Sequence, residues 1–377
     1  MTSNLAIVQD LTTGRKEGYM KTGKTLTELA VELTRIQQAK KDFIVPTTKL
    51  SMTEKGDLQF TNGAAHDYKL TSFSAGQVAS FADVPKQYFD RILAENPKLA
   101  ADSVNHGFAR NAKTEVQQKD TARLVRTIDG KVRGFLSDKY RILDSHDLLE
   151  TALPELMQND FEVMSSEITD KRLYLKCASP KIEGEVKKGD VIRYGVMLST
   201  SDVGAGSLRV EPYFLRLACL NGMVSETKFS KAHLGRSNYE NDIRELMSDN
   251  TKRLNDAAFF ATVRDYLKST MNPQNFEREL NKMREASERK IENMDLVEVV
   301  ELTAKQFGVT GENTKKGILQ ALAQGNEGAG LTQWGLANSF TRFAQDDSLD
   351  YDQSTELERV GSAIIELNPS QWQKIAV

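Results

Sequence analysis

The sequence predicts an α+β fold, in which a mixed or antiparallel sheet core with β-hairpins and helices is followed by a mainly helical C-terminal region. Three observations predict this class. The dipeptide Asp129-Gly130 joins two alternating apolar runs, and further strand-like runs lie between residues 161 and 219. After Ser237 the apolar spacing is almost entirely helical.

The chain length favours more than one structural unit. At roughly 100–200 residues per domain, 377 residues allow two or three domains with a large core. We expect residues 1–41 to form a tail and one helix, residues 42–236 an α+β core domain, and residues 237–377 a helical region.

The N-terminal helix has a clear start. Thr25 and Glu28 stand at the spacing of a capping box, in which each side chain satisfies the other residue's backbone N–H. Leu29, Leu33 and Ile36 then recur at helical spacing. Strands are expected next at residues 43–52 and 58–60, with helices opening at Ser74 and Pro85.

Residues 122–136 carry the strongest local signal, a two-residue hairpin at Asp129-Gly130. The register that follows pairs Ile128 with Lys131, Thr127 with Val132, Arg126 with Arg133, and Leu124 with Phe135. Two guanidinium groups would then face each other, which destabilises a strand pair by a few tenths of a kcal/mol or more. A bound phosphate backbone could offset this repulsion, and so could a nearby carboxylate from Asp138 or Glu115.

The second half of the core continues with strands and ends in helices. A helix is expected from Ser145, then a hairpin over residues 161–177 in which Glu167 faces Arg172. Strands at 191–198 and 208–219 flank a polar, glycine-containing loop. Helices are expected over residues 239–267, 276–307, 315–322, 332–343 and 354–365.

Charge is unevenly distributed along the chain. The formal net charge is −3, which predicts no general attraction to nucleic acid or to an anionic membrane. Residues 110–141 nevertheless carry nine basic and four acidic side chains, so this segment is +5 and the remainder −8. The segment is therefore a candidate anion site. An ordinary solvated surface is the alternative.

Composition also bears on location. No apolar run reaches the ~18 residues of a membrane helix, and the first residues lack the apolar stretch of a signal peptide. Two cysteines, Cys177 and Cys219, are too few for a disulfide scaffold and fit a reducing compartment. We expect no membrane partner and a cytoplasmic location.

Recognisable catalytic spacing is absent from the sequence. It contains no HExxH, CxxC, GxSxG or P-loop motif, and Gly204-Ala205-Gly206 lacks the third glycine of a phosphate loop. Asp144, Asp147 and Glu150 line a helix start, where the helix dipole alone explains them. We expect no catalytic residue, metal site or cofactor.

Three segments resemble a known family. These are LVRTIDGKVRGFLSDKYRILDSHDLL, then GDVIRYGVMLSTSDVGAGSLRVEPYFLRLACLNGMV, then TQWGLANSFTRFAQD. They resemble the phage/plasmid-like family named domain of unknown function 932, over roughly residues 43–365. The sequence departs from that pattern at residues 199–202. The resemblance implies a mobile-element protein in a bacterial host cell and assigns no reaction.

These observations lead to a functional hypothesis. We expect a DNA-binding protein that binds or anneals single-stranded DNA in recombination or replication, similar in role to single-strand annealing proteins of the Rad and Red-beta kind. Phosphates would be held electrostatically, and Tyr140 or Phe135 would stack on a base. The expected nucleic-acid-binding residues are Arg123, Arg126, Lys131, Arg133, Lys139, Tyr140, Arg141, Arg209 and Arg216.

Two alternatives come from other classes of protein. One is a phage-encoded inhibitor or interaction protein that acts on a host factor through the acidic helical half. The other is a metal-dependent enzyme on nucleotides or DNA, with residues 202–207 as its phosphate site. The long C-terminal helices also suggest a homo-oligomer, against the alternative of a monomer.

Overall fold

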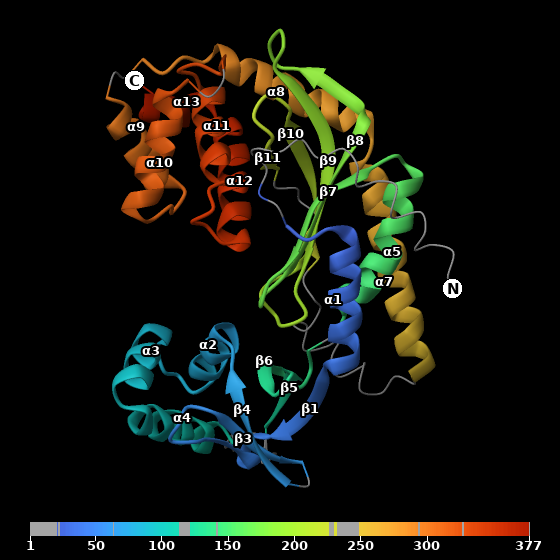
Figure 1. Cartoon of the computed structure of the whole chain (residues 1–377), viewed down its shortest axis with the longest axis vertical. Helices are drawn as coiled ribbons and strands as arrows, with labels where there is room; N and C mark the ends of the chain where they lie inside the picture. Colours follow the sequence, from blue (N-terminus) through green and yellow to red (C-terminus); the bar gives the residue numbers. More distant parts are fainter. Residues whose placement is uncertain are drawn as a thin grey trace.

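The computed structural model describes residues 21, 23–62, 64–112, 121–140, 142–225, 230–231, 249–292, 295–325 and 328–376. Within them the chain forms two sheets, one in the N-terminal half and one at the centre of the molecule, with helices packed around both (Figure 1). This mixed arrangement and the helical C-terminal region confirm the predicted fold class. Among the described helices, none combines the length and hydropathy that a bilayer-crossing segment requires.

The first sheet has the strand order β1-β5-β6-β4-β3-β2. Its strands are β1 (Lys41–Pro46), β2 (Leu50–Met52), β3 (Leu58–Asn62), β4 (Ala64–Leu70), β5 (Ala122–Ile128) and β6 (Lys131–Ser137). Neighbours are antiparallel except β4 and β6, which run parallel. Between β4 and β5 the chain forms α2 (Ser72–Phe81), α3 (Lys86–Glu95) and α4 (Pro97–Asn111). Buried Val78, Phe89 and Phe108 join these helices to the sheet in one core.

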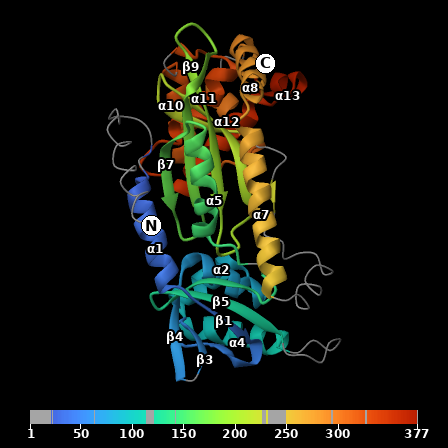
Figure 2. The same cartoon turned by 90° about the vertical axis from the view of Figure 1, so that its right-hand side faces the viewer.

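The second sheet is antiparallel, in the order β11-β10-β9-β8-β7, and β12 also pairs with β10. Its strands are β7 (Glu162–Ile168), β8 (Leu173–Glu185), β9 (Val191–Thr200), β10 (Leu208–Arg216), β11 (Asn221–Val224) and β12 (Ser230–Lys231). On one side lie α1 (Leu26–Ala39), α5 (Ser145–Gln158) and α7 (Asp249–Thr270), as Figure 2 shows. Alternate strand residues such as Leu175 and Leu198 share a core with these helices because side chains alternate between sheet faces.

The C-terminal helices cover the other side of the second sheet (Figure 1). They are α8 (Pro273–Glu288), α9 (Leu296–Gln306), α10 (Glu312–Ala323), α11 (Gln333–Phe343), α12 (Tyr351–Ile365) and α13 (Pro369–Ala376). Their apolar side chains form a core around Trp334 and Phe340 that extends to Tyr194 and Phe214 of the sheet.

Toward α12 the sheet is polar as well as buried. Lys176 of β8 forms an ion pair with Glu358 of α12, the Nζ–Oε2 distance being 2.5 Å, and both side chains are almost completely buried. Glu211 of β10 accepts two hydrogen bonds from the Arg359 guanidinium, at 2.8 and 3.2 Å. Charged side chains with specific partners therefore join α12 to the sheet.

Several local predictions can be compared with the structure. The capping box of Thr25 and Glu28 is confirmed, and α1 buries the predicted Leu29, Leu33 and Ile36. The predicted pairing of Glu167 with Arg172 is wrong. Glu167 pairs with Tyr174, because Thr169 N–H donates to Arg172 O and so lengthens the turn.

The long helix predicted over residues 276–307 is divided into α8 and α9. The chain leaves the helix after Glu288 because it pairs with another segment: Ile291 N–H donates to Leu331 O at 3.0 Å. Of the helix predicted over 239–267, α7 forms the described part, and residues 239–248 lie outside the described residues. Within the predicted core domain, 42–236, the described strands form two sheets, and the domain boundaries themselves stay a prediction.

Candidate nucleic-acid interface

The hairpin predicted at Asp129-Gly130 is present as β5 and β6. Asp129 and Gly130 have φ angles of 49° and 74°, the positive values that a two-residue hairpin turn requires. The pairs nearest the turn are those predicted, Ile128 with Lys131 and Thr127 with Val132.

Beyond these pairs the predicted register is wrong. A β-bulge places Arg126 opposite Gly134 and Leu124 opposite Leu136. Arg133 is the additional residue of β6, so the two guanidinium groups do not occupy opposed positions. The repulsion that suggested a bound polyanion is therefore not a feature of this hairpin.

Arg126 is completely buried and bound by acidic groups of the protein itself. Its Nε and Nη2 donate to the Asp42 carboxylate at 2.9 and 3.0 Å, and Nη2 also donates to Asp144 Oδ1 at 2.8 Å. Its Nη1 donates to the backbone oxygen of Asp202 at 2.6 Å. These partners come from β1, from the residue before α5 and from the β9–β10 loop.

Three further side chains complete this buried ionic network. Lys40 pairs with Asp144, and Arg133 Nη1 donates to Asp202 Oδ2 at 3.3 Å. The other oxygen of Asp202 accepts from the Ser145 N–H at 2.9 Å, at the first turn of α5. Lys40, Arg126 and Arg133 thus meet Asp42, Asp144 and Asp202. The protein itself therefore supplies the carboxylates that neutralise Arg126 and Arg133. The predicted Asp138 is not one of them, and Glu115 lies outside the described residues.

The remaining predicted residues lie in different environments. Arg216 is buried, and its Nε donates to Asp190 Oδ1 at 2.6 Å, so it too has an internal carboxylate partner. Arg209 is half-buried, with Nη1 3.7 Å from Glu211 Oε1. Tyr140 donates to Ser201 O at 3.0 Å, and burial raises the pKa of its hydroxyl. Lys131 and Lys139 are exposed, and Arg141 lies outside the described residues.

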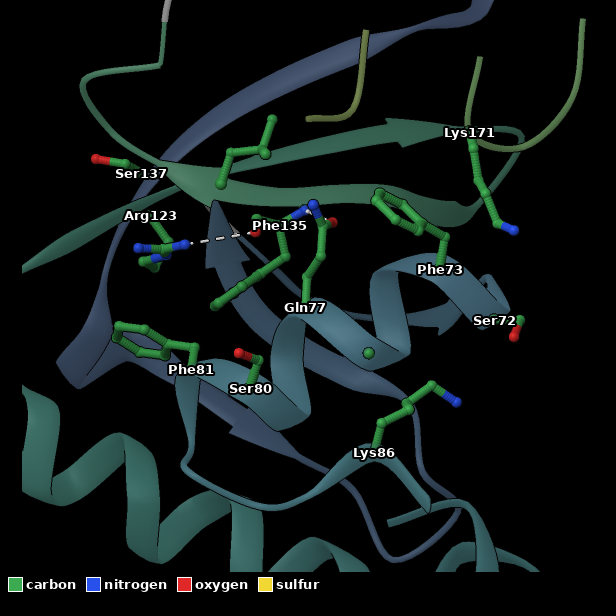
Figure 3. A pocket seen from close by; sticks show the side chains of 12 residues that line it. Ser72, Phe73, Gln77, Ser80, Phe81, Lys86, Arg123, Phe135, Ser137 and Lys171 are labelled. Carbon is green, nitrogen blue, oxygen red and sulfur yellow. Dashed lines mark hydrogen bonds between the residues drawn. The ribbon is translucent and has the colours of Figure 1, made fainter. Parts of the chain in front are cut away.

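Arg123 lines a cavity of about 680 Å³, which we call the candidate site (Figure 3). The cavity lies where α2 and the hairpin meet the turn between β7 and β8. Among the described residues that line it, none carries a carboxylate. They are Ser72, Phe73, Gly76, Gln77, Ser80, Phe81, Lys86, Arg123, Phe135, Leu136, Ser137 and Lys171.

The Arg123 guanidinium packs on two aromatic rings of the candidate site. Its Cζ lies 4.5 Å from the centroid of Phe81 and 5.0 Å from that of Phe135. Nη2 donates to Phe135 O at 3.4 Å, while the buried Nε has no partner. Burial lowers the pKa of Arg123 to about 10, against the opposing charge of Asp138. The side chain is therefore cationic at neutral pH, and its hydrogen bonds are incomplete.

Gln77 fixes the wall of the candidate site. It accepts from the Phe135 N–H at 2.8 Å (Figure 3). It also donates to Val203 O at 2.8 Å. The loop that contains Val203 joins β9 to β10. In this loop Ser201 Oγ accepts from Val203 N and Ala205 N, so the protein itself uses these two N–H groups. A phosphate bound at residues 202–207, the alternative prediction, would therefore lack these two N–H donors.

Sequence reasoning missed Phe73, Lys86 and Lys171 in the candidate site. Lys86 pairs with Asp90 on α3, and Lys171 Nζ lies 3.7 Å from Asp352. Both lysines are partly exposed, and such pairs are weak because water screens them. No local pattern marks these residues, since they come together only where the β7–β8 turn meets α2.

One group could offer metal ligands in the described part of the chain. His146, Asp147 and Glu150, on the first turn of α5, have donor atoms within 4.8 Å of one another. They are exposed or half-buried, and acidic residues are favourable at a helix N-terminus without a metal.

Comparison with known proteins assigns the chain to one family. The model of a family described as a domain of unknown function (DUF932) matches residues 132–363, more than half of the chain. Neither a curated protein nor a solved structure matches it. The match includes Lys171 of the candidate site and begins after Arg123.

Proposed function

Because the chain belongs to the family described as a domain of unknown function (DUF932), whose description names no activity, we propose its function from the candidate site: the protein binds single-stranded DNA. The observation that carries this proposal is a cavity wall with three cations, three phenyl rings and no carboxylate among the described lining residues. Phosphates need cations, and unpaired bases stack on aromatic side chains.

The geometry supports a division of roles within the site. Lys86 and Lys171 extend toward the cavity with Phe73 between them (Figure 3). A base stacks on Phe73, whose ring is half-buried, while these lysines bind the adjacent phosphates. Arg123 binds a further phosphate, which completes the hydrogen bonding of its guanidinium and offsets the cost of its burial.

The wider setting is part of the same proposal. The protein acts in the cytoplasm of a bacterial host, encoded by a phage or plasmid, and anneals single strands in recombination or replication. Annealing requires two bound strands, which an oligomer provides. A mass measurement in solution, with and without an oligonucleotide, tests that requirement.

The first prediction concerns the three cations of the candidate site. We expect the triple variant Lys86→Gln, Arg123→Gln, Lys171→Gln to bind oligothymidylate at least tenfold more weakly than the unmodified protein. Since each phosphate contact on a single strand contributes about 0.7 to the slope of log K against log salt, the slope should fall by about 2. A fluorescence anisotropy titration at several salt concentrations measures both quantities.

A matched control distinguishes the loss of the candidate site from the loss of net charge. Lys55, Lys188 and Lys374 are exposed and lie outside the candidate site, so their triple glutamine variant should bind normally. If both triple variants bound oligothymidylate equally weakly, the loss of affinity would come from net charge and not from the candidate site. Absence of binding by the unmodified protein at low salt would end the proposal.

A further inference from the structure

A second cavity, of about 470 Å³, lies between α1, the tip of the β5–β6 hairpin and the β7–β8 turn. It is separate from the candidate site and has none of its lining residues. Thr71, the residue before α2, is part of its wall, so the N-terminus of a ten-residue helix lies beside it.

Two lysines of this cavity are directly opposed in the first sheet. Lys69 of β4 is the register partner of Lys131 of β6, and both line the cavity. Like charges on opposed strand residues repel each other. Within the described residues, neither lysine forms an ion pair. The facing cations predicted for Arg126 and Arg133 are therefore present in this sheet at another pair of positions.

A third cation of the cavity is buried with incomplete hydrogen bonding. Arg133 is only 9% exposed, lines the cavity and gives one hydrogen bond to Asp202, while its Nε and Nη2 have no partner. Unpartnered donors of a buried guanidinium cost free energy, which an acceptor from a ligand would offset.

The acidic residues of the cavity do not balance these cations. Glu32 and Asp129 both bind Arg35 on α1. Among the described lining residues this leaves Asp170, in the β7–β8 turn, as the carboxylate without a cationic partner. The adjacent N-terminus of α2 adds a partial positive charge. The lining therefore holds four cations and three carboxylates, and Asp202, which pairs with Arg133, lies outside it.

We infer that this second cavity binds a phosphate group through Lys69, Lys131 and Arg133. The inference does not depend on DNA binding at the candidate site. A phosphate oxygen relieves the repulsion between the two lysines and accepts from the arginine. The chemistry is shared by a phosphodiester of a nucleic acid and by a free phosphate or phosphomonoester.

The test uses inorganic phosphate as the probe and the full chain. Isothermal titration at constant ionic strength, with chloride as the reference salt, should show phosphate binding. The double variant Lys69→Gln, Lys131→Gln should lose at least tenfold in affinity, while the exposed control pair Lys55→Gln, Lys188→Gln should bind as the unmodified protein does. Absence of phosphate binding, or equal affinity in the double variant, would overturn the inference.

Two further arms identify the source of the phosphate and keep the two proposals apart. If an oligothymidylate without terminal phosphates displaces inorganic phosphate, the inference is supported and the ligand of the second cavity is a phosphodiester. If inorganic phosphate still binds in the presence of the oligonucleotide, the inference is supported and the ligand is a free phosphate or a phosphomonoester. The triple variant of Lys86, Arg123 and Lys171 should still bind phosphate. Loss of phosphate binding there would assign the anion to the candidate site and overturn the inference.

Discussion

Replacement of Arg126 by methionine is expected to lower the free energy of unfolding by about 3–5 kcal/mol at pH 7. The Arg126 side chain is completely buried and binds Asp42, Asp144 and the backbone oxygen of Asp202. Methionine fills a similar space but leaves these acceptors without their donor. The loss of an ion's partner inside a protein is costly because the remaining charge stays desolvated.

The effect of this substitution should depend on pH. Burial alone would raise the pKa of Asp144, but Arg126 and Lys40 outweigh it and hold the pKa below its ordinary value. The stability that comes from this lowered pKa is present above the ordinary aspartate range and is lost as pH falls through the lowered value. Urea unfolding at pH 7 and pH 3 should therefore show a smaller difference between the two proteins in acid.

An exposed arginine serves as the control for Arg126. Arg278 has a side chain 66% exposed and stands 3.6 Å from Glu279. Its replacement by methionine should change stability by about 1 kcal/mol or less, since water screens surface pairs. If both substitutions changed the free energy of unfolding equally, the buried network would not stabilise the fold as argued.

The second large effect is expected for Lys176, whose replacement by methionine should cost about 3–5 kcal/mol. Its ammonium group pairs with Glu358 and lies 4.7 Å from the centroid of Tyr351. Burial opposes the charge of Lys176, yet Glu358 and Tyr351 more than offset it and raise the pKa. Without the lysine, the buried Glu358 carboxylate loses its ion-pair partner and keeps Gln345 as a donor at 3.3 Å.

A second substitution should rescue this variant. Adding Glu358→Gln to Lys176→Met removes the uncompensated charge, so the double variant should recover at least half of the lost stability. Denaturant unfolding of the single and double variants measures the recovery. Additive losses in the double variant would show that Lys176 acts by packing and not through its charge.

Predictions from the sequence succeeded where a few neighbouring residues decide the structure. The turn at Asp129-Gly130 and the capping box at Thr25 depend on interactions within three or four positions, and both are confirmed. The register farther along the hairpin was not predictable in this way. The bulge at Arg133 accompanies hydrogen bonds of Arg126 and Arg133 to Asp202, about 70 residues away in the chain.

The candidate site illustrates the same limit for function. Among its cations only Arg123 was predicted, from a basic segment of the sequence. Lys86 and Lys171 belong to separate elements and reach one cavity only where the turn between β7 and β8 meets α2.

The amino-acid sequence alone determined the fold class, the main hairpin and the start of α1, because turn geometry, capping and apolar periodicity are local interactions. Tertiary structure alone decided which basic residues are neutralised within the protein and which line a cavity. Coulomb attraction and desolvation depend on distance in space and not on distance along the chain. Carboxylates remote in the sequence therefore neutralise Arg126, while Arg123 lies at the cavity wall.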